Sequence, residues 1–182
     1  GLTSALEYYQ LFQPDSFVEE VVHQSVLYAT QNNHNIPAPN TNTLNLANYR
    51  CMEAMLLHGG YAPVPRRRML WEDKMDCRNM LVADAIRRDD LEAVMKALHF
   101  CDNANLDPQD GFFKVRPIFN NLNRNSTRWF SDQQRYSVDE VMIPYYGRHS
   151  AKQFIRGKPI RYGYKAWAIC TADGCGVHFE PY

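Results

Sequence analysis

Residues 137–148 read "SVDEVMIPYYGR", and this stretch decides the fold expected for the last part of the chain. Its first segment, 137–144, is short and rich in β-branched residues, which is typical of a strand. Two later segments, "RYGYKAWAIC" at 161–170 and "GVHFEPY" at 176–182, alternate in the same manner. The pair Asp173-Gly174 between them is a turn signal. The sequence therefore predicts an antiparallel meander of three strands.

The sequence before these strands has helical periodicity. A capping box of Ser16 and Glu19 opens a predicted helix within 14–30. A second helix is expected from about residue 43 to the glycine pair 59–60, and a third over 88–100. A shorter helix within 112–123 is expected to turn four apolar side chains inward. These are Val115, Ile118, Phe119 and Leu122.

Helices followed by strands indicate the α+β class. We expect a helical domain over residues 1–135, interrupted by an Asn-rich loop at about 32–42, and a sheet domain over 136–182. With 182 residues, of which 45% are hydrophobic, the chain is long enough to bury a core. Three strands alone leave an open edge and an apolar face, which indicates a missing partner segment or oligomerisation.

Composition excludes several classes of protein. The 20 basic and 20 acidic residues give no net charge, so only local clustering can indicate an anionic partner. The five cysteines are scattered and form no CxxC pair, which favours free thiols in a reducing, intracellular environment. No apolar run approaches the roughly 18 residues of a membrane span, so no membrane partner is expected.

Asp139 and Glu140 are adjacent carboxylates in the first predicted strand. Because successive side chains of a strand point to opposite faces, these two cannot chelate one ion together. Asp139 shares its face with Val141 and Ile143, where an unpaired carboxylate is costly. This cost indicates a metal ligand, but a strand-end acid in solvent or a salt bridge to an arginine fits the same spacing.

A basic stretch follows the first strand, and it contains no acid from residue 141 to 172. Its cations are candidate DNA-binding residues: Arg148, Lys152, Arg156, Lys158, Arg161 and Lys165. They are interleaved with aromatic residues: Tyr145, Tyr146, Phe154, Tyr162 and Tyr164. The pattern fits phosphate contacts beside stacking side chains, and equally a solvated hairpin with core tyrosines. An arginine run at 66–68 is interpreted as a solvated loop or a phosphate contact.

The stretch "YSVDEVMIPYYGRHSAKQFIRGKPIRYGYKAWAI" at 136–169 closely resembles the start of the catalytic domain of piggyBac-type transposases and of the transposable element-derived proteins descended from them. The resemblance extends to "LVADAIRRDDLEAVMKALHFCDN" at 81–103 and "FFKVRPIFNNLN" at 112–123. It reaches back to "LEYYQLFQPDSFVEEVVHQSVLYAT" at 6–30, so it covers nearly the whole chain.

The resemblance implies an RNase H-like catalytic domain that holds two magnesium ions with acidic residues, preceded by a helical dimerisation and DNA-binding domain. In such enzymes, metal-assisted displacement at phosphodiesters cuts and joins DNA at transposon ends. On this match Asp139 corresponds to the first metal-binding aspartate, and Glu140 is not carried over as a ligand. DNA as a partner, whether transposon-end-like or non-specific, a homodimer in the longer parent protein, and a nuclear location are implied as well.

The family's remaining catalytic aspartates lie beyond the third strand, whereas this sequence ends at Tyr182. A single carboxylate is a poor magnesium site, because the ion keeps its waters unless several oxygen ligands compete for it. We therefore expect Mg²⁺ to serve the longer parent, and this chain alone neither to hold the ion stably nor to cut DNA.

Three functions follow from these expectations. The chain is part of a cut-and-paste DNA transposase, a domesticated DNA-binding or dimerising module without catalysis, or a vestigial fragment without folded function. Salt-sensitive DNA binding separates the second from the third, and a cooperative unfolding transition counts against the third.

Overall fold

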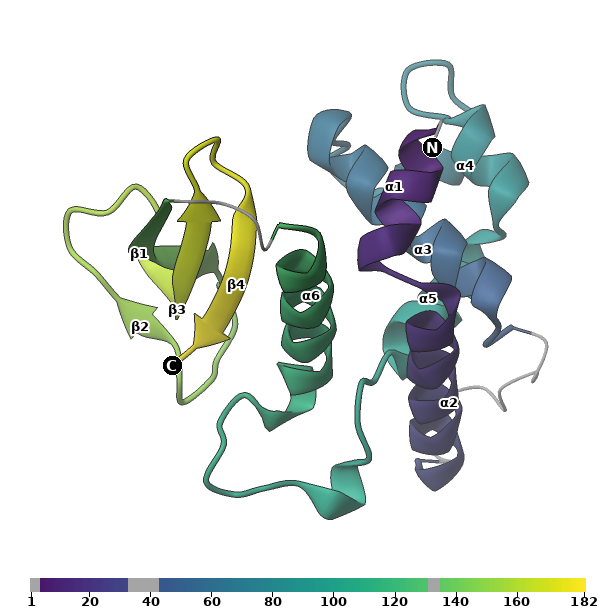
Figure 1. Ribbon diagram of the computed structural model, residues 1–182. Helices are drawn as coiled ribbons and strands as arrows, with labels where there is room; N and C mark the ends of the chain where they lie inside the picture. Colours follow the sequence, from purple (N-terminus) through teal and green to yellow (C-terminus); the bar gives the residue numbers. More distant parts are fainter. Residues whose placement is uncertain (1–3, 33–42, 131–134) are drawn as a thin grey trace. The chain divides into compact units, whose positions relative to one another are not determined.

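The computed structural model describes residues 4–32, 43–130 and 135–182. The chain divides into two compact units, which are considered separately (Figure 1). One unit is Asp15–Asp102, and the other combines Gly1–Pro14 with Asn103–Tyr182. The predicted Asn-rich loop lies outside the described residues except for Asn32, which forms part of a turn.

The unit Asp15–Asp102 is helical and holds the main hydrophobic core. Its elements are α2 (Asp15–Gln31), α3 (Leu46–Tyr61), the 3-10 helix η1 (Arg67–Trp71), α4 (Met80–Ala85) and α5 (Arg88–Ala97). The predicted apolar spacing is confirmed where α2 buries Val18 and Val21 and α5 buries Leu91 and Val94. Helix α2 begins at Asp15, just before the predicted cap residue Ser16.

Helix α3 does not end at the glycine pair as predicted. It begins at Leu46 with Asn45 as its cap, continues through Gly59 and Gly60, and ends at Tyr61. Neither glycine has a positive φ, and a Cβ at either would meet nothing within 4 Å. The two residues thus occupy an open helix surface instead of forming a left-handed cap, and the helix stops just before a proline-rich segment.

The other unit combines helices with the sheet. Its elements are α1 (Ala5–Phe12), the 3-10 helices η2 (Asn103–Asn105) and η3 (Phe113–Val115), α6 (Arg116–Trp129), and the strands β1 (Tyr136–Pro144), β2 (Gln153–Phe154), β3 (Tyr162–Thr171) and β4 (Gly176–Pro181). Helix α6 packs against β4 on one side and contacts α1, as Figure 1 shows for the strand side. The α+β class is confirmed.

The sheet is the predicted antiparallel meander with one additional short strand. The central strand β3 pairs with β1 and with β4. The two-residue strand β2 pairs with the beginning of β3. The turn between β3 and β4 contains Gly174 with φ of 84°, and its N–H donates to the Thr171 carbonyl at 3.0 Å. The predicted Asp173-Gly174 turn is therefore confirmed, because this positive φ suits glycine.

Helix α6 buries polar side chains, contrary to the prediction of an apolar inner face. Asn121, Asn123 and Asn125 are at most 9% exposed, whereas the four predicted apolar residues are only half-buried. Asn121 and Asn125 donate to the carbonyl of Phe12 at 2.9 and 3.0 Å, which fastens the end of α1 to α6. Asparagine suits these positions because it satisfies backbone groups that would otherwise be buried without partners.

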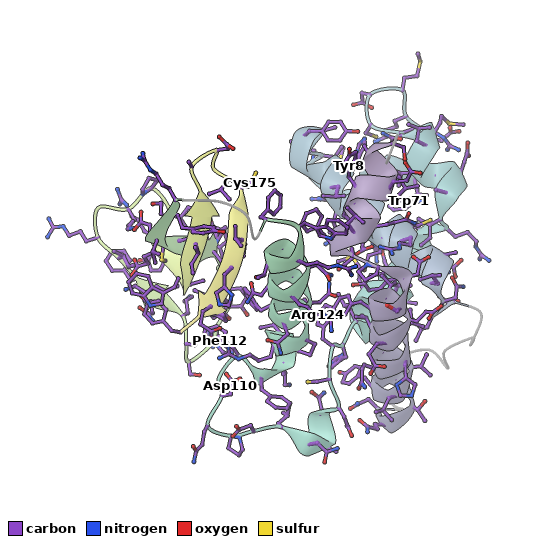
Figure 2. The ribbon with its side chains drawn as sticks, viewed as in Figure 1. Tyr8, Trp71, Asp110, Phe112, Arg124 and Cys175 are labelled. Atoms are coloured by element: carbon purple, nitrogen blue, oxygen red, sulfur yellow. The ribbon has the colours of Figure 1, made fainter. Side chains whose placement is uncertain are left out.

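Arg116 fastens the start of α6 to both its preceding loop and the sheet. Its Nε lies 2.6 Å from Asp110 Oδ2, and Nη1 pairs with Glu180 of β4. Asp110, labelled in Figure 2 beside the beginning of α6, has its pKa lowered chiefly by the hydrogen bond from Arg116. The same hydrogen bond raises the pKa of Arg116. This anchoring explains why α6 belongs to the compact unit that contains the strands.

The contacts divide the chain differently from the predicted boundary after residue 135. Helices α1 and α6 belong to the same unit as the strands, and the purely helical unit ends at Asp102. The buried asparagines and Arg116 cause this difference, because they join α6 to elements far away in sequence. All five cysteines are free thiols, as predicted. Among the described residues, no helix is long and apolar enough to cross a membrane.

Candidate functional site

The Asp139 carboxylate lies on β1 and is exposed to solvent. The strand register places Asp139 opposite Ala168, on the face where Ile143 lies opposite Tyr164. This face turns toward the start of α6, because Ile143 and Tyr164 line a cavity together with α6 residues. Oδ1 of Asp139 accepts the N–H of Glu140 at 2.7 Å. No ion pair involves Asp139 within the described ranges, which excludes the salt bridge to a described arginine.

Glu140 points to the other face of the sheet, where two lysines and a tyrosine surround it. Its Oε2 lies 2.8 Å from Lys165 Nζ and accepts a hydrogen bond from the Tyr182 hydroxyl at 2.6 Å. Its Oε1 lies 3.7 Å from Lys158 Nζ. The hydrogen bond from Lys165, followed by that from Tyr182, lowers the pKa of Glu140. The predicted separation of the two adjacent carboxylates onto opposite faces is present in the strand.

The described residues do not by themselves fit a magnesium ion. Magnesium requires near-octahedral oxygen coordination with more than one carboxylate or phosphate competing with water. Within the parts of the chain that the structure describes, no group of three or more His, Cys, Asp or Glu side chains could hold a metal ion. Asp139 is therefore one candidate ligand that has no companion ligands among the residues that the structure describes.

The six cations of the basic stretch divide into two groups. The lysines are held by the protein: Lys152 donates to the carbonyl of Gly147 at 2.7 Å, and Lys158 and Lys165 pair with Glu140. The remaining three cations are exposed and have no side-chain partner among the described residues: Arg148, Arg156 and Arg161. The lysines thus neutralise an internal carboxylate or brace the loop, and the arginines remain available to an external anion.

The aromatic residues of the same stretch also divide. Tyr145 and Tyr164 are half-buried, with ring centroids 4.9 Å apart. Phe154 and Tyr162 pack on each other at 4.8 Å but are 55% and 48% exposed, and Tyr146 is 87% exposed. The hairpin therefore contains both half-buried tyrosines and exposed rings. A solvated hairpin with core tyrosines describes the first group, and stacking side chains beside phosphate contacts describe the second.

One cluster of cations could not be predicted from the sequence. The arginine run 66–68 lies in or beside η1, where it meets Arg88 and Lys96 of α5 around a shared pocket. The signal was the second basic pair at 87–88, but nothing in the spacing shows that the two segments meet.

Comparison with known proteins gives the class of this chain. Residues 4–182 match the family model described as Transposase IS4, so the chain is of the transposase class. Two relatives narrow the class: the chain is 43% identical over 176 residues to "PiggyBac transposable element-derived protein 3" of Homo sapiens, and 40% identical over 173 residues to "PiggyBac transposable element-derived protein 2" of Homo sapiens. The chain belongs to the piggyBac family of transposases and transposable element-derived proteins, which confirms the resemblance.

The alignments cover 97% and 95% of this chain but only 29% and 28% of the two relatives, so the chain spans less than a third of their length. The chain also resembles a solved structure described as "Cryo-EM structure of piggyBac transposase synaptic complex with hairpin DNA", with a TM-score of 0.81. The match covers 100% of the present chain and 39% of the chain in the solved structure. The sequence identity of 18% means that this likeness establishes the fold alone.

Proposed function

We propose that this chain binds the phosphate backbone of DNA through the loop after β1, as part of a piggyBac-type protein whose complete chain cuts and joins DNA. The observation that carries the proposal is a set of exposed arginines that have no side-chain partner among the described residues: Arg148, Arg156 and Arg161. No acid lies between residues 141 and 172 to compete for them. Arginine suits phosphate because its planar donors form paired hydrogen bonds to two phosphate oxygens.

Exposed rings beside these arginines support a nucleic-acid ligand. Tyr146 and Phe154 present 87% and 55% of their surface to solvent, and each lies two residues before one of these arginines. Aromatic rings next to cations stack on bases while the cations bind phosphates. Lys152 adds rigidity by bonding the Gly147 carbonyl, so less loop entropy is lost on binding.

Replacing Arg148, Arg156 and Arg161 together by glutamine is expected to weaken binding to duplex DNA by about tenfold or more, because three phosphate contacts are lost. The slope of log affinity against log salt concentration is expected to become shallower by at most about 3. Fluorescence anisotropy with a labelled duplex over a range of salt concentrations measures both quantities.

The matched control removes the same charge from three other exposed cations of the same unit: Lys114, Arg128 and Arg135. This control should retain most of the affinity of the unmodified chain. Equal losses in the two variants would show that binding depends on net charge alone, and an unchanged affinity in the loop variant would refute the proposed contact surface.

We also propose that Asp139 supplies one of the carboxylates that hold Mg²⁺ in the longer parent protein. The accessible carboxylate and the family membership support this assignment. Because the described residues offer no companion ligands, the 182-residue chain is expected neither to bind magnesium stoichiometrically nor to nick DNA. Calorimetric titration with Mg²⁺ and a plasmid-nicking assay test this. Metal-dependent nicking that Asp139→Ala abolishes would overturn the expectation.

A second candidate function is a domesticated DNA-binding or dimerising module without catalysis. The same arginines support it, since they need no metal to act. The two candidate functions differ in the longer protein. A domesticated module would not excise a transposon-end substrate, whether Asp139 is present or replaced by alanine. Family membership further supports a homodimer in the parent protein and a nuclear location, which sedimentation and imaging of the full-length protein would test.

A further inference from the structure

A pocket of about 350 Å³ lies between η1 and α5, wholly within the helical unit Asp15–Asp102. Its rim is dominated by positive charge. Three of these cations come from the arginine run and two from α5: Arg66, Arg67, Arg68, Arg88 and Lys96. Because both segments belong to one compact unit, this pocket is a separate feature from the basic loop after β1.

Two rim cations are already neutralised by carboxylates. Arg68 forms a bidentate pair with Glu92, at 2.6 Å from Nε to Oε1 and 2.9 Å from Nη2 to Oε2. The hydrogen bond from Arg68 lowers the pKa of Glu92. Arg88 Nε lies 2.9 Å from Asp89 Oδ1. Glu92 also attracts Lys96, which lies four residues further along α5.

The five cations thus exceed the two acids, Glu92 and Asp89, by three positive charges. Arg67 makes its side-chain contact to the sulfur of Met95, which is a weak acceptor and carries no charge. Arg66 and Lys96 are exposed and form no side-chain hydrogen bond or ion pair in the described ranges, although the charge of Glu92 attracts Lys96. This excess of positive charge around one concavity favours the entry of an anion. Lys96 in the last turn of α5 also favours the helix dipole, but this does not explain the two arginines opposite it.

The floor of the pocket is apolar and fixed. Trp71, labelled in Figure 2, donates its indole N–H to the Ile86 carbonyl at 2.9 Å, which holds the ring in place. Leu91 is 1% exposed and lies beneath the pocket with Met95. These side chains give the pocket a fixed apolar wall, beside which the exposed cations of the arginine run and Lys96 lie.

We propose that this pocket is a phosphate-binding site in which Arg66, Arg67 and Lys96 contact the phosphate oxygens. A group with two or more negative charges matches the excess of three positive charges, and Arg67 supplies the planar donors that phosphate favours. Two sources offer this chemistry: a free phosphorylated compound, or a phosphate of a nucleic-acid strand. The site is independent of the proposed loop contacts, since it uses none of their residues.

Calorimetric titration of the 182-residue chain with inorganic pyrophosphate tests the site. Saturable binding is expected, and the variant Arg66→Gln/Arg67→Gln/Lys96→Gln should weaken it at least about tenfold. The loop variant at Arg148, Arg156 and Arg161 is the matched control, and it should bind pyrophosphate like the unmodified chain. Equal pyrophosphate affinity in the unmodified chain and in the variant Arg66→Gln/Arg67→Gln/Lys96→Gln would overturn the proposal.

Two further measurements complete the test. If the triple variant loses its cooperative melt, Arg66→Gln/Lys96→Gln replaces it, because these two side chains form no hydrogen bond or ion pair with the described residues and their loss should still weaken binding. Competition with a DNA duplex separates the two sources. If the duplex displaces pyrophosphate from the loop variant as well as from the unmodified chain, the site binds a nucleic-acid phosphate. If the duplex displaces no pyrophosphate, the site binds a free phosphorylated ligand. Loss of DNA binding in the loop variant alone concerns the earlier proposal and leaves this one intact.

Discussion

Replacing Asn123 by alanine is expected to lower the stability of the unit that contains the sheet by about 3 kcal/mol. The side chain of Asn123 donates from Nδ2 to the Phe179 carbonyl at 2.8 Å and accepts the Phe179 N–H at 2.8 Å. It is only 9% exposed. Alanine leaves both backbone groups of Phe179 without their partner, and each unpaired buried group costs about 1–3 kcal/mol.

The position of Phe179 makes this loss more serious than the energies alone indicate. Among the described strands β4 pairs only with β3, so its other side is a sheet edge. Asn123 occupies that edge and prevents another chain from pairing with it at Phe179. The variant is therefore expected to aggregate more readily, as well as to open more often.

Hydrogen–deuterium exchange read on peptides from β4 measures the effect, with peptides of the helical unit as an internal reference. Protected amides of β4 should exchange on the order of 100-fold faster in the variant. The matched control is Asn120→Ala, which removes an exposed asparagine from the same helix and should leave exchange within about twofold. Equal protection in both variants would show that water substitutes for the Asn123 side chain.

The strands could be predicted because their evidence is local. Alternation over 161–170 and 176–182, with a positive-φ glycine in the turn, leaves little freedom in the pairing. The two residues of β2 have no alternating pattern of their own. They form a strand because β3 offers unpaired backbone groups beside them. The face of α6 was missed because asparagine is read as a surface residue, and only the backbone groups it meets explain its burial.

The candidate site shows the same division between local and tertiary evidence. Strand alternation was enough to place Asp139 and Glu140 on opposite faces. It could not separate the arginines of the basic stretch from the lysines, because that separation depends on Lys158 and Lys165 reaching Glu140 across the fold. The pocket beside Trp71 was equally hidden, since α4 separates its two segments in sequence.

Replacing Gly163 by alanine is expected to destabilise the β1–β3 pair by about 3 kcal/mol, at the upper end of the cost of overpacking. Gly163 lies opposite Pro144 on β1 and opposite Gln153 on β2. A Cβ at this position would overlap the carbonyl oxygen of Ile143, and it would lie 2.8 Å from the Ile143 carbonyl carbon and 3.1 Å from Pro144 Cα. All three are backbone atoms, so no side-chain rotation relieves the clash and β1 itself must move.

The displacement reaches the proposed DNA contacts, because the end of β1 leads directly into the loop that carries Arg148. Exchange of the β1 and β3 amides should therefore quicken in Gly163→Ala, and DNA affinity should fall although no cation is removed. Gly111→Ala is the matched control, since a Cβ there meets nothing within 4 Å and its φ is not positive. If Gly163→Ala weakens the strand pair but leaves DNA affinity at the level of Gly111→Ala, the loop binds DNA without needing β1 to position it, and the rigid placement proposed for the arginines is wrong.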